Sequence, residues 1–268
     1  MKKVSVDGTI YEREGHGPPV VLVHGLGLNR GMWQWLTCDL KDSFEVFTFD
    51  LFGHGDSPKP PSTPSLTLFS GQINNLLKTV RREKAAIVGF SLGGMIVRRF
   101  AQNYPHYVMA LAILNSPHAR TTSEREAVLE RVRQVEKYGP EATIEAALER
   151  WFTPQFRAAE PAILEKIRQW ISANDPNIYA KNYRVLAEAD AEIREVIKTL
   201  SCPTLVMTGE DDHGNSPNMT LEMVKAIPNS RAIILPKLRH MALVEDPKLF
   251  NPPLVSFLKK ALIKQERI

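Results

Sequence analysis

Short apolar runs alternate with longer amphipathic runs over residues 1–117 and again over 199–268 of this 268-residue chain. The short runs are rich in Val and Ile and end at a glycine or polar residue, which is typical of buried strands. The longer runs repeat their apolar positions at helical spacing. This alternation predicts an α/β fold in which a mostly parallel sheet carries helices on both faces, with a site at the carboxyl ends of the strands. The predicted strands span 4–12 (a strand or hairpin), 19–23, 44–49, 85–89, 110–114, 203–208 and 231–235, and the clearest helices span 66–83 and 92–104.

The strand pattern stops between about residues 118 and 198, where helical patterns follow one another. Predicted helices there span 123–138, 141–151, 161–173, 177–189 and 191–200, with Gly-Pro, Thr-Pro and Asp-Pro pairs as breaks. We therefore predict a core domain of residues 1–117 and 199–268, with a helical cap of residues 118–198 inserted into it. Such a cap predicts a partly enclosed pocket that favours small substrates over long lipids.

One segment of the predicted core carries a chemical signature. Gly89-Phe-Ser-Leu-Gly93 places Ser91 between two glycines, directly after an apolar strand and directly before an amphipathic helix. This is the pattern of a nucleophile elbow, a tight turn that exposes the serine above the sheet and needs glycines where chain segments pack closely. We therefore expect Ser91 to be a catalytic nucleophile.

A serine nucleophile needs a histidine base, and the histidine needs a carboxylate that orients it. Behind such an elbow the acid and then the histidine follow along the chain. Only His240 fits, since it lies in a loop just past the last predicted strand. The other six histidines come too early or stand beside the acid: His16, His24, His54, His106, His118 and His213.

The acid is expected in the loop after strand 203–208, where Glu210, Asp211 and Asp212 are adjacent. Spacing alone does not choose between them. The chain resembles the α/β-hydrolase superfamily, whose acid commonly ends a GxxD pattern, and this resemblance implies Asp212. Asp211 stays the alternative, and Glu210 is interpreted as a solvent-facing or bracing residue.

Two backbone N–H groups are candidates for an oxyanion hole. The first is that of Leu92, the residue after the nucleophile. The second is that of Leu26, because His24-Gly-Leu-Gly27 follows a buried strand and resembles the superfamily's HGxG motif. Preorganised donors of this kind stabilise the anion that develops in acyl transfer.

The resemblance covers nearly the whole chain. Residues 50–57 resemble the superfamily's DxxGHGxS segment, which we interpret as structural. Within the superfamily, Arg-Trp-Phe-Thr-Pro at 150–154 is most similar to the 3-oxoadipate enol-lactonase and carboxylesterase group. Trp151, with Phe90 and His118, is the candidate set of substrate-binding residues. The chain departs from the superfamily at Arg239, where glycine often precedes the histidine, and Pro252-Pro253 is expected in the first turn of the last helix.

Composition excludes several other classes. The net charge is +4 and the pI is near 9.0, but no basic run alternates with aromatic residues as nucleic-acid binding would require. Basic pairs such as Arg98-Arg99 are interpreted as solvated surface. We expect no membrane segment, no disulfide framework and a cytoplasmic location. No metal ion or other cofactor is expected, since no second ligand is spaced to join His54. The sequence leaves open whether the protein forms a homodimer.

These observations predict a serine hydrolase of small carboxylic esters or lactones that works through an acyl-enzyme. Carbon–carbon bond hydrolases and perhydrolases use the same triad and stay open as alternatives. A further alternative, from another class, is a ligand receptor that keeps the scaffold without turnover.

Overall fold

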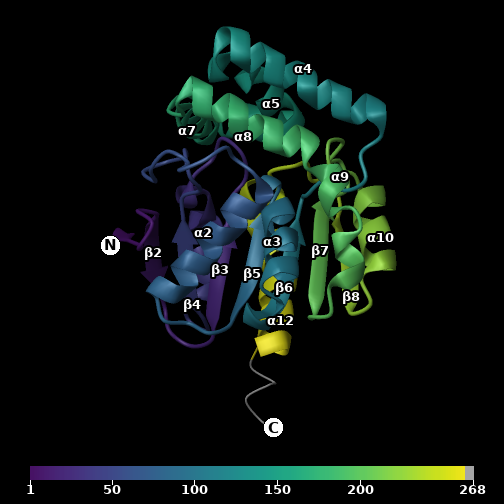
Figure 1. Ribbon diagram of the computed structural model, residues 1–268. Coiled ribbons are helices and arrows are strands. Elements are labelled where there is room, and N and C mark those ends of the chain that lie inside the picture. Colours follow the sequence, from purple (N-terminus) through teal and green to yellow (C-terminus); the bar gives the residue numbers. More distant parts are fainter. Residues whose placement is uncertain (263–268) are drawn as a thin grey trace.

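The computed structural model describes residues 1–262, and Figure 1 shows its layers. Eight strands form one sheet in the order β1-β2-β4-β3-β5-β6-β7-β8. The pairs β1–β2 and β2–β4 are antiparallel, and all other neighbours are parallel. The predicted mostly parallel sheet is therefore confirmed. The strands are β1 Lys3–Val4, β2 Ile10–Glu14, β3 Pro19–Val23, β4 Glu45–Phe49, β5 Ala85–Phe90, β6 Val108–Leu114, β7 Thr204–Gly209 and β8 Ser230–Leu235.

The central strands form the middle of the core. Every residue of β5 and β7 is buried, because parallel strands covered by helices on both faces have no solvated side. Helices α2 and α3 lie on one face of the sheet, and α12 passes behind it (Figure 1). The helices that surround the sheet are α1 Gln34–Leu40, α2 Leu66–Thr79, α3 Leu92–Asn103, α10 Pro217–Ala226, α11 Ala242–Glu245 and α12 Pro247–Leu262.

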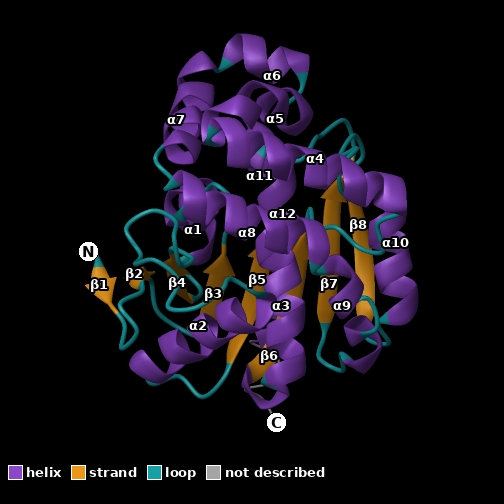
Figure 2. Ribbon diagram, turned by 45° about the horizontal axis from the view of Figure 1, so that its top comes forward, coloured by secondary structure: helices purple, strands orange, loops and turns teal. Residues whose placement is uncertain are grey.

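Between β6 and β7 the chain forms a helical layer over one end of the sheet. Figure 2 shows α4, α5, α6 and α7 above the strands. Helix α4 begins with a capping box in which Thr121 and Glu124 exchange side-chain and backbone hydrogen bonds. The helices of this layer are α4 Thr122–Tyr138, α5 Ile144–Trp151, α6 Pro154–Ala159, α7 Pro161–Ser172, α8 Pro176–Glu188 and α9 Asp190–Ile193.

Several predicted elements differ from those observed. The break predicted at Thr153-Pro154 is present, but a short helix, α6, that was not predicted begins there, with Thr153 as its cap and Pro154 at its first position, where the missing N–H costs nothing. The helix expected over 191–200 is instead the four-residue α9 and the 3-10 turn Val196–Thr199. Asp190 there accepts a hydrogen bond from the backbone N–H of Arg120 at 2.7 Å, a tertiary contact that local spacing does not reveal.

Two expectations about single residues are also wrong. Pro252 and Pro253 lie inside α12 and not in its first turn, because Asp246 accepts from the N–H of Leu249 and starts the helix earlier. Arg98 is not solvated surface but fully buried. Its guanidinium donates to the carbonyls of Gly94 and Pro117, at 3.0 and 2.6 Å, and so ties the start of α3 to the segment after β6. Its long side chain therefore braces the core.

Within residues 1–262, no helix is long and apolar enough to cross a membrane.

Candidate active site

Ser91 lies at the sharp turn between β5 and α3. Its backbone angles are φ +54° and ψ −114°, which a residue with a side chain rarely adopts. Two hydrogen bonds hold the turn: the Ser91 N–H donates to the Leu114 carbonyl at 2.9 Å, and the Ser116 hydroxyl donates to the Ser91 carbonyl at 2.9 Å. The geometry is that of a nucleophile elbow supported from β6.

The two elbow glycines are required by close packing. A Cβ atom on Gly93 would lie well under 3.0 Å from the carbonyl oxygen of Val23, and one on Gly89 equally close to the carbonyl of Gly93. Both obstacles are backbone, which cannot move aside as a flexible side chain could. Gly93 therefore lets the elbow pack against β3, and Gly89 lets the strand end pack against the start of α3.

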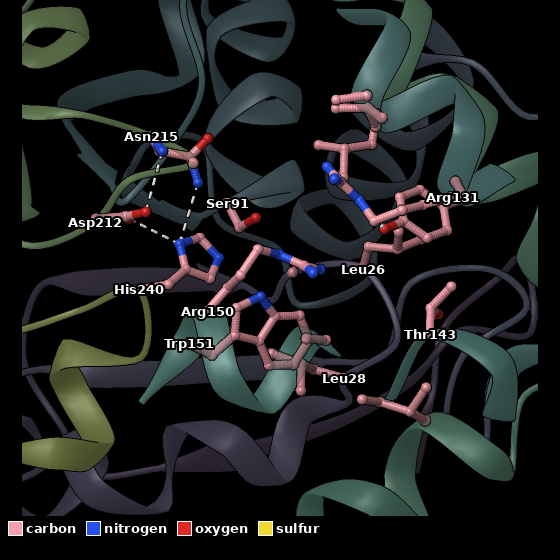
Figure 3. Close-up of a pocket in the computed structure, with 18 of the residues that line it drawn as sticks. Leu26, Leu28, Ser91, Arg131, Thr143, Arg150, Trp151, Asp212, Asn215 and His240 are labelled. Carbon is pink, nitrogen blue, oxygen red and sulfur yellow. Dashed lines mark hydrogen bonds and ion pairs between the residues drawn. The ribbon is translucent and has the colours of Figure 1, made fainter. Parts of the chain in front are cut away.

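His240 and Asp212 form a buried pair at the carboxyl ends of the strands. The Nδ1 atom of His240 lies 2.8 Å from Oδ2 of Asp212. Asn115 donates from Nδ2 to the same carboxylate oxygen at 3.0 Å, and the Asn215 backbone N–H donates to Oδ1 at 3.0 Å. The side-chain amide of Asn215 also lies 3.1 Å from His240 Nδ1 (Figure 3). Neither asparagine was predicted as a site residue, although Asn115 directly follows β6 and Asn215 lies in the loop that follows β7.

Ser91, Asp212 and His240 line one cavity of about 250 Å³, which lies between the sheet and the helical layer above it. Within residues 1–262 the Ser91 hydroxyl makes no hydrogen bond to His240, a contact that in many enzymes tightens only when substrate binds. Figure 3 shows both side chains facing the same space. The Phe90 and Trp151 rings lie 4.9 and 5.8 Å from the His240 ring, so two apolar surfaces flank the imidazole.

The loop after β3 brings Leu26 to the same cavity. His24 anchors this loop, since its Nε2 accepts from the N–H of Leu51 at 2.9 Å and its Nδ1 lies 2.7 Å from the Gly25 carbonyl. Across the described chain, neither the Leu26 nor the Leu92 N–H donates a hydrogen bond. Both donors are thus unpaired, and Leu92 occupies the first position of α3, where a helix also presents its positive dipole end.

The structure separates His118 from this group. His118 does not line the cavity, so its predicted place among the substrate-binding residues is wrong. Its ring is buried among Arg98 and Asp190, and burial together with the Arg98 charge lowers the pKa of His118 to about 4. His118 follows the carboxyl end of β6, where site residues are expected, but its ring is buried outside the cavity.

Three arginines that line the cavity were not predicted: Arg120, Arg131 and Arg150. Arg120 follows β6, Arg131 lies on α4 and Arg150 near the end of α5. A charged residue on an amphipathic helix is usually solvated, so periodicity gave no sign that these three converge. Only the packing of the helical layer over the sheet brings them together.

Arg239, the departure from the superfamily pattern, joins the histidine loop to the end of α5. Its guanidinium donates to the carbonyl of Phe152 at 3.2 Å, and its N–H donates to Glu245 at 2.8 Å. Glu245 also accepts from the N–H of Thr153 at 2.6 Å. The His240 loop is therefore fastened to the segment that carries Trp151.

Other titratable groups near the site serve the scaffold. Burial lowers the pKa of His24 to about 4 and that of His54 to about 3, so both rings are neutral at pH 7. Asp50 accepts from the backbone N–H groups of Arg30 and Asp56 at 2.7 and 2.9 Å. No group of three or more His, Cys, Asp or Glu side chains in the described part of the chain is placed to hold a metal ion.

Comparison with known proteins agrees with the observed fold. The family model of the alpha/beta hydrolase fold matches residues 18–147. An (E)-2-((N-methylformamido)methylene)succinate hydrolase of Acinetobacter baylyi is 28% identical over 93% of each chain. A 3-oxoadipate enol-lactonase of that organism is 27% identical over 91% of this chain and 89% of its own.

Solved structures extend the agreement to the whole chain. The enol-lactonase from Burkholderia xenovorans LB400 superposes with a TM-score of 0.89 at 26% identity, covering 97% of this chain and all of that one. A thermophilic esterase from Thermogutta terrifontis gives 0.87 at 27% identity over 98% of both chains. Sheet order, family match and relatives lead to one conclusion: this chain is a hydrolase with the α/β-hydrolase fold.

Proposed function

We propose that the protein hydrolyses small carboxylic esters or lactones through an acyl-enzyme, with Ser91, His240 and Asp212 as the catalytic triad. The observation that carries the proposal is the convergence of an elbow serine and a 2.8 Å histidine–carboxylate pair on one cavity. Three segments far apart in the sequence supply these groups.

The proposed chemistry assigns each atom a role. The Ser91 oxygen attacks the carbonyl carbon while His240 Nε2 takes its proton, and the charged ring is stabilised by Asp212 at Nδ1. The proton then passes to the leaving alcohol oxygen as its bond to carbon breaks. Water, activated by the same histidine, releases the acid and restores the serine.

The backbone N–H groups of Leu26 and Leu92 are proposed to hold the oxyanion of each tetrahedral intermediate. Neither donates elsewhere within residues 1–262, so they are free to do so without rearrangement. Fixed donors of this kind stabilise the developing charge without reorganisation during the reaction.

The choice of ester or lactone is supported by the cavity and by the relatives. A cavity of about 250 Å³ suits a small acyl group better than a long chain. Relatives of near full-length coverage carry the names enol-lactonase and esterase.

The test compares wild type with Ser91→Ala and His240→Ala on p-nitrophenyl acetate, butyrate and octanoate and on a panel of lactones. We expect turnover by wild type, strongest on the short substrates, and a loss of kcat of about 10³-fold or more in each variant. Circular dichroism of the variants checks that they fold.

Fluorophosphonate labelling separates an enzyme from a receptor on the same scaffold. Rapid labelling of wild type at Ser91 with steady turnover supports the proposal. Labelling without turnover of any ester or lactone would favour the receptor, and an active His240→Ala would contradict the triad.

A further inference from the structure

Three arginine side chains line the cavity that holds Ser91 and His240: Arg120, Arg131 and Arg150. Figure 3 shows Arg131 and Arg150 directed into it from α4 and from the end of α5. Each of the three is only partly exposed.

None of the three guanidinium groups forms an ion pair with an acid of the described chain. No carboxylate of residues 1–262 lies within 4.0 Å of these guanidinium groups, whereas an exposed arginine on α4, Arg133, pairs with Glu126 and Glu130. Arg120 donates to the Leu186 carbonyl at 2.7 Å, and Arg131 donates from Nε to the hydroxyl of Tyr183 at 3.0 Å. Both acceptors are neutral, and Asp190 accepts from the backbone N–H of Arg120 and not from its guanidinium. The charge of Asp190 favours the charged form of Arg120, whereas Arg131 and Arg150 have no acidic partner within residues 1–262.

The two acids that line the cavity are already engaged. Asp212 binds His240, and Glu124 accepts from the N–H and hydroxyl of Thr121 at 2.7 and 2.8 Å in the capping box of α4. Burial, together with the charge of Arg131, lowers the pKa of both Arg120 and Arg150. Three partly buried cations that repel one another cost stability unless an anion joins them.

We propose that this cavity binds a substrate with a free carboxylate besides the carbonyl that is cleaved, so that the substrate is a half-ester or lactone of a short dicarboxylic acid. This inference rests on the proposed ester or lactone hydrolysis. The planar guanidinium fork matches a carboxylate with two parallel hydrogen bonds, and the Tyr183 hydroxyl adds a further donor beside Arg131.

The kinetic test compares the monomethyl and dimethyl esters of glutaric acid, which share the scissile group and differ by one charge. We expect wild type to prefer the charged half-ester. In Arg131→Gln and Arg150→Gln the ratio of the two kcat/KM values should fall about tenfold or more, as expected for a hydrogen bond to a charged group. Arg133→Gln, an exposed position on α4 outside the cavity, is the matched control and should leave the ratio unchanged.

A binding test reads the same site without turnover. Glutarate should raise the melting temperature of Ser91→Ala, while the neutral glutaramide should not, and Arg150→Gln in that background should abolish the shift. Arg131→Lys and Arg150→Lys keep the charge without the fork, and should retain part of the shift if the glutamine variants do not fold.

The outcomes separate the two proposals. Glutarate binding without hydrolysis of any ester would contradict the proposed function and leave the carboxylate site standing. Hydrolysis of the dimethyl ester as fast as the half-ester, with no effect of glutarate, would overturn the carboxylate site alone. Stabilisation by inorganic phosphate but not by glutarate would overturn the choice of carboxylate as the anion.

Discussion

At the residue scale, Asp211 and Asp212 are neighbours whose contacts differ. The Asp212 carboxylate is buried and accepts from His240, Asn115 and the backbone N–H of Asn215. Asp211 is half-buried, and its backbone N–H donates to the Leu238 carbonyl at 2.9 Å, which directs the turn after β7. The contacts therefore favour Asp212 as the triad acid, the residue that the superfamily resemblance implied.

Replacing each aspartate by asparagine tests that choice. Asp212→Asn should lower kcat about 10³-fold or more, because an amide neither stabilises the charged imidazole nor fixes its tautomer. Asp211→Asn is the matched control and should keep kcat within about twofold. Steady-state hydrolysis of p-nitrophenyl acetate measures both, and a larger loss in Asp211→Asn would reverse the assignment.

Prediction of single residues from sequence succeeded where a chemically suitable residue type stands at the position along the chain that the fold requires for its role. Ser91 stands inside a five-residue motif, and His240 was isolated by its order after the last strand. Arg131 belongs to no motif, and Arg150 stands in the family-like segment 150–154, where only Trp151 was predicted to bind substrate. His118 failed for the converse reason, since a suitable position in sequence does not fix the direction of a side chain.

At the element scale, the elbow depends on how closely α3 approaches β3. We expect Gly93→Ala to lower the free energy of unfolding by at least about 2 kcal/mol, because the added Cβ would meet the fixed carbonyl of Val23. Gly71, in the middle of α2, has nothing within 4 Å of an added Cβ. Gly71→Ala should therefore stabilise by about 0.5–1 kcal/mol through helix propensity. Urea unfolding of both variants measures the difference, and equal effects would refute this account.

Prediction of elements was most accurate for buried strands. Residues 19–23 were predicted as β3 with its observed bounds, because a continuous apolar run between polar residues leaves little choice. Short helices were less accurate: the break at Thr153-Pro154 was predicted, but not that the six-residue helix α6 begins there. A Thr-Pro pair can be followed by a loop or by a new helix, and tertiary packing determines which of the two forms.

At the scale of the whole molecule, buried neutral histidines link stability to pH. The pKa values of His24, His54 and His118 are lowered to about 4, 3 and 4, chiefly by burial. Below about pH 6.5 these three histidines bind protons in the unfolded chain, whereas in the folded chain they stay neutral until the pH is much lower. The free energy of unfolding is thus highest above this pH and falls as the pH drops toward 4.

His118 offers the clearest test, since its ring is surrounded by the charges of Arg98, Asp190, Arg194 and Glu195 and lies outside the cavity. In His118→Gln the slope of unfolding free energy against pH between 6 and 5 should become shallower by about 1 kcal/mol per pH unit. His16→Gln, at an exposed position, should leave the slope unchanged. Urea unfolding at several pH values measures the slope, and identical slopes for wild type and His118→Gln would contradict the linkage.

The sequence by itself determined the sheet, the elbow and the order of the groups proposed for catalysis, because these follow from local periodicity, steric limits at glycine and chain direction. Only the tertiary structure decided which groups share the cavity. In the folded chain Asn115 and Asn215 donate hydrogen bonds to Asp212, and His118 and Arg98 are buried. Three arginines line the same cavity as Ser91: Arg120, Arg131 and Arg150. The physical reason is that side-chain convergence depends on how the helical layer packs over the sheet, and this packing joins residues that no local pattern connects.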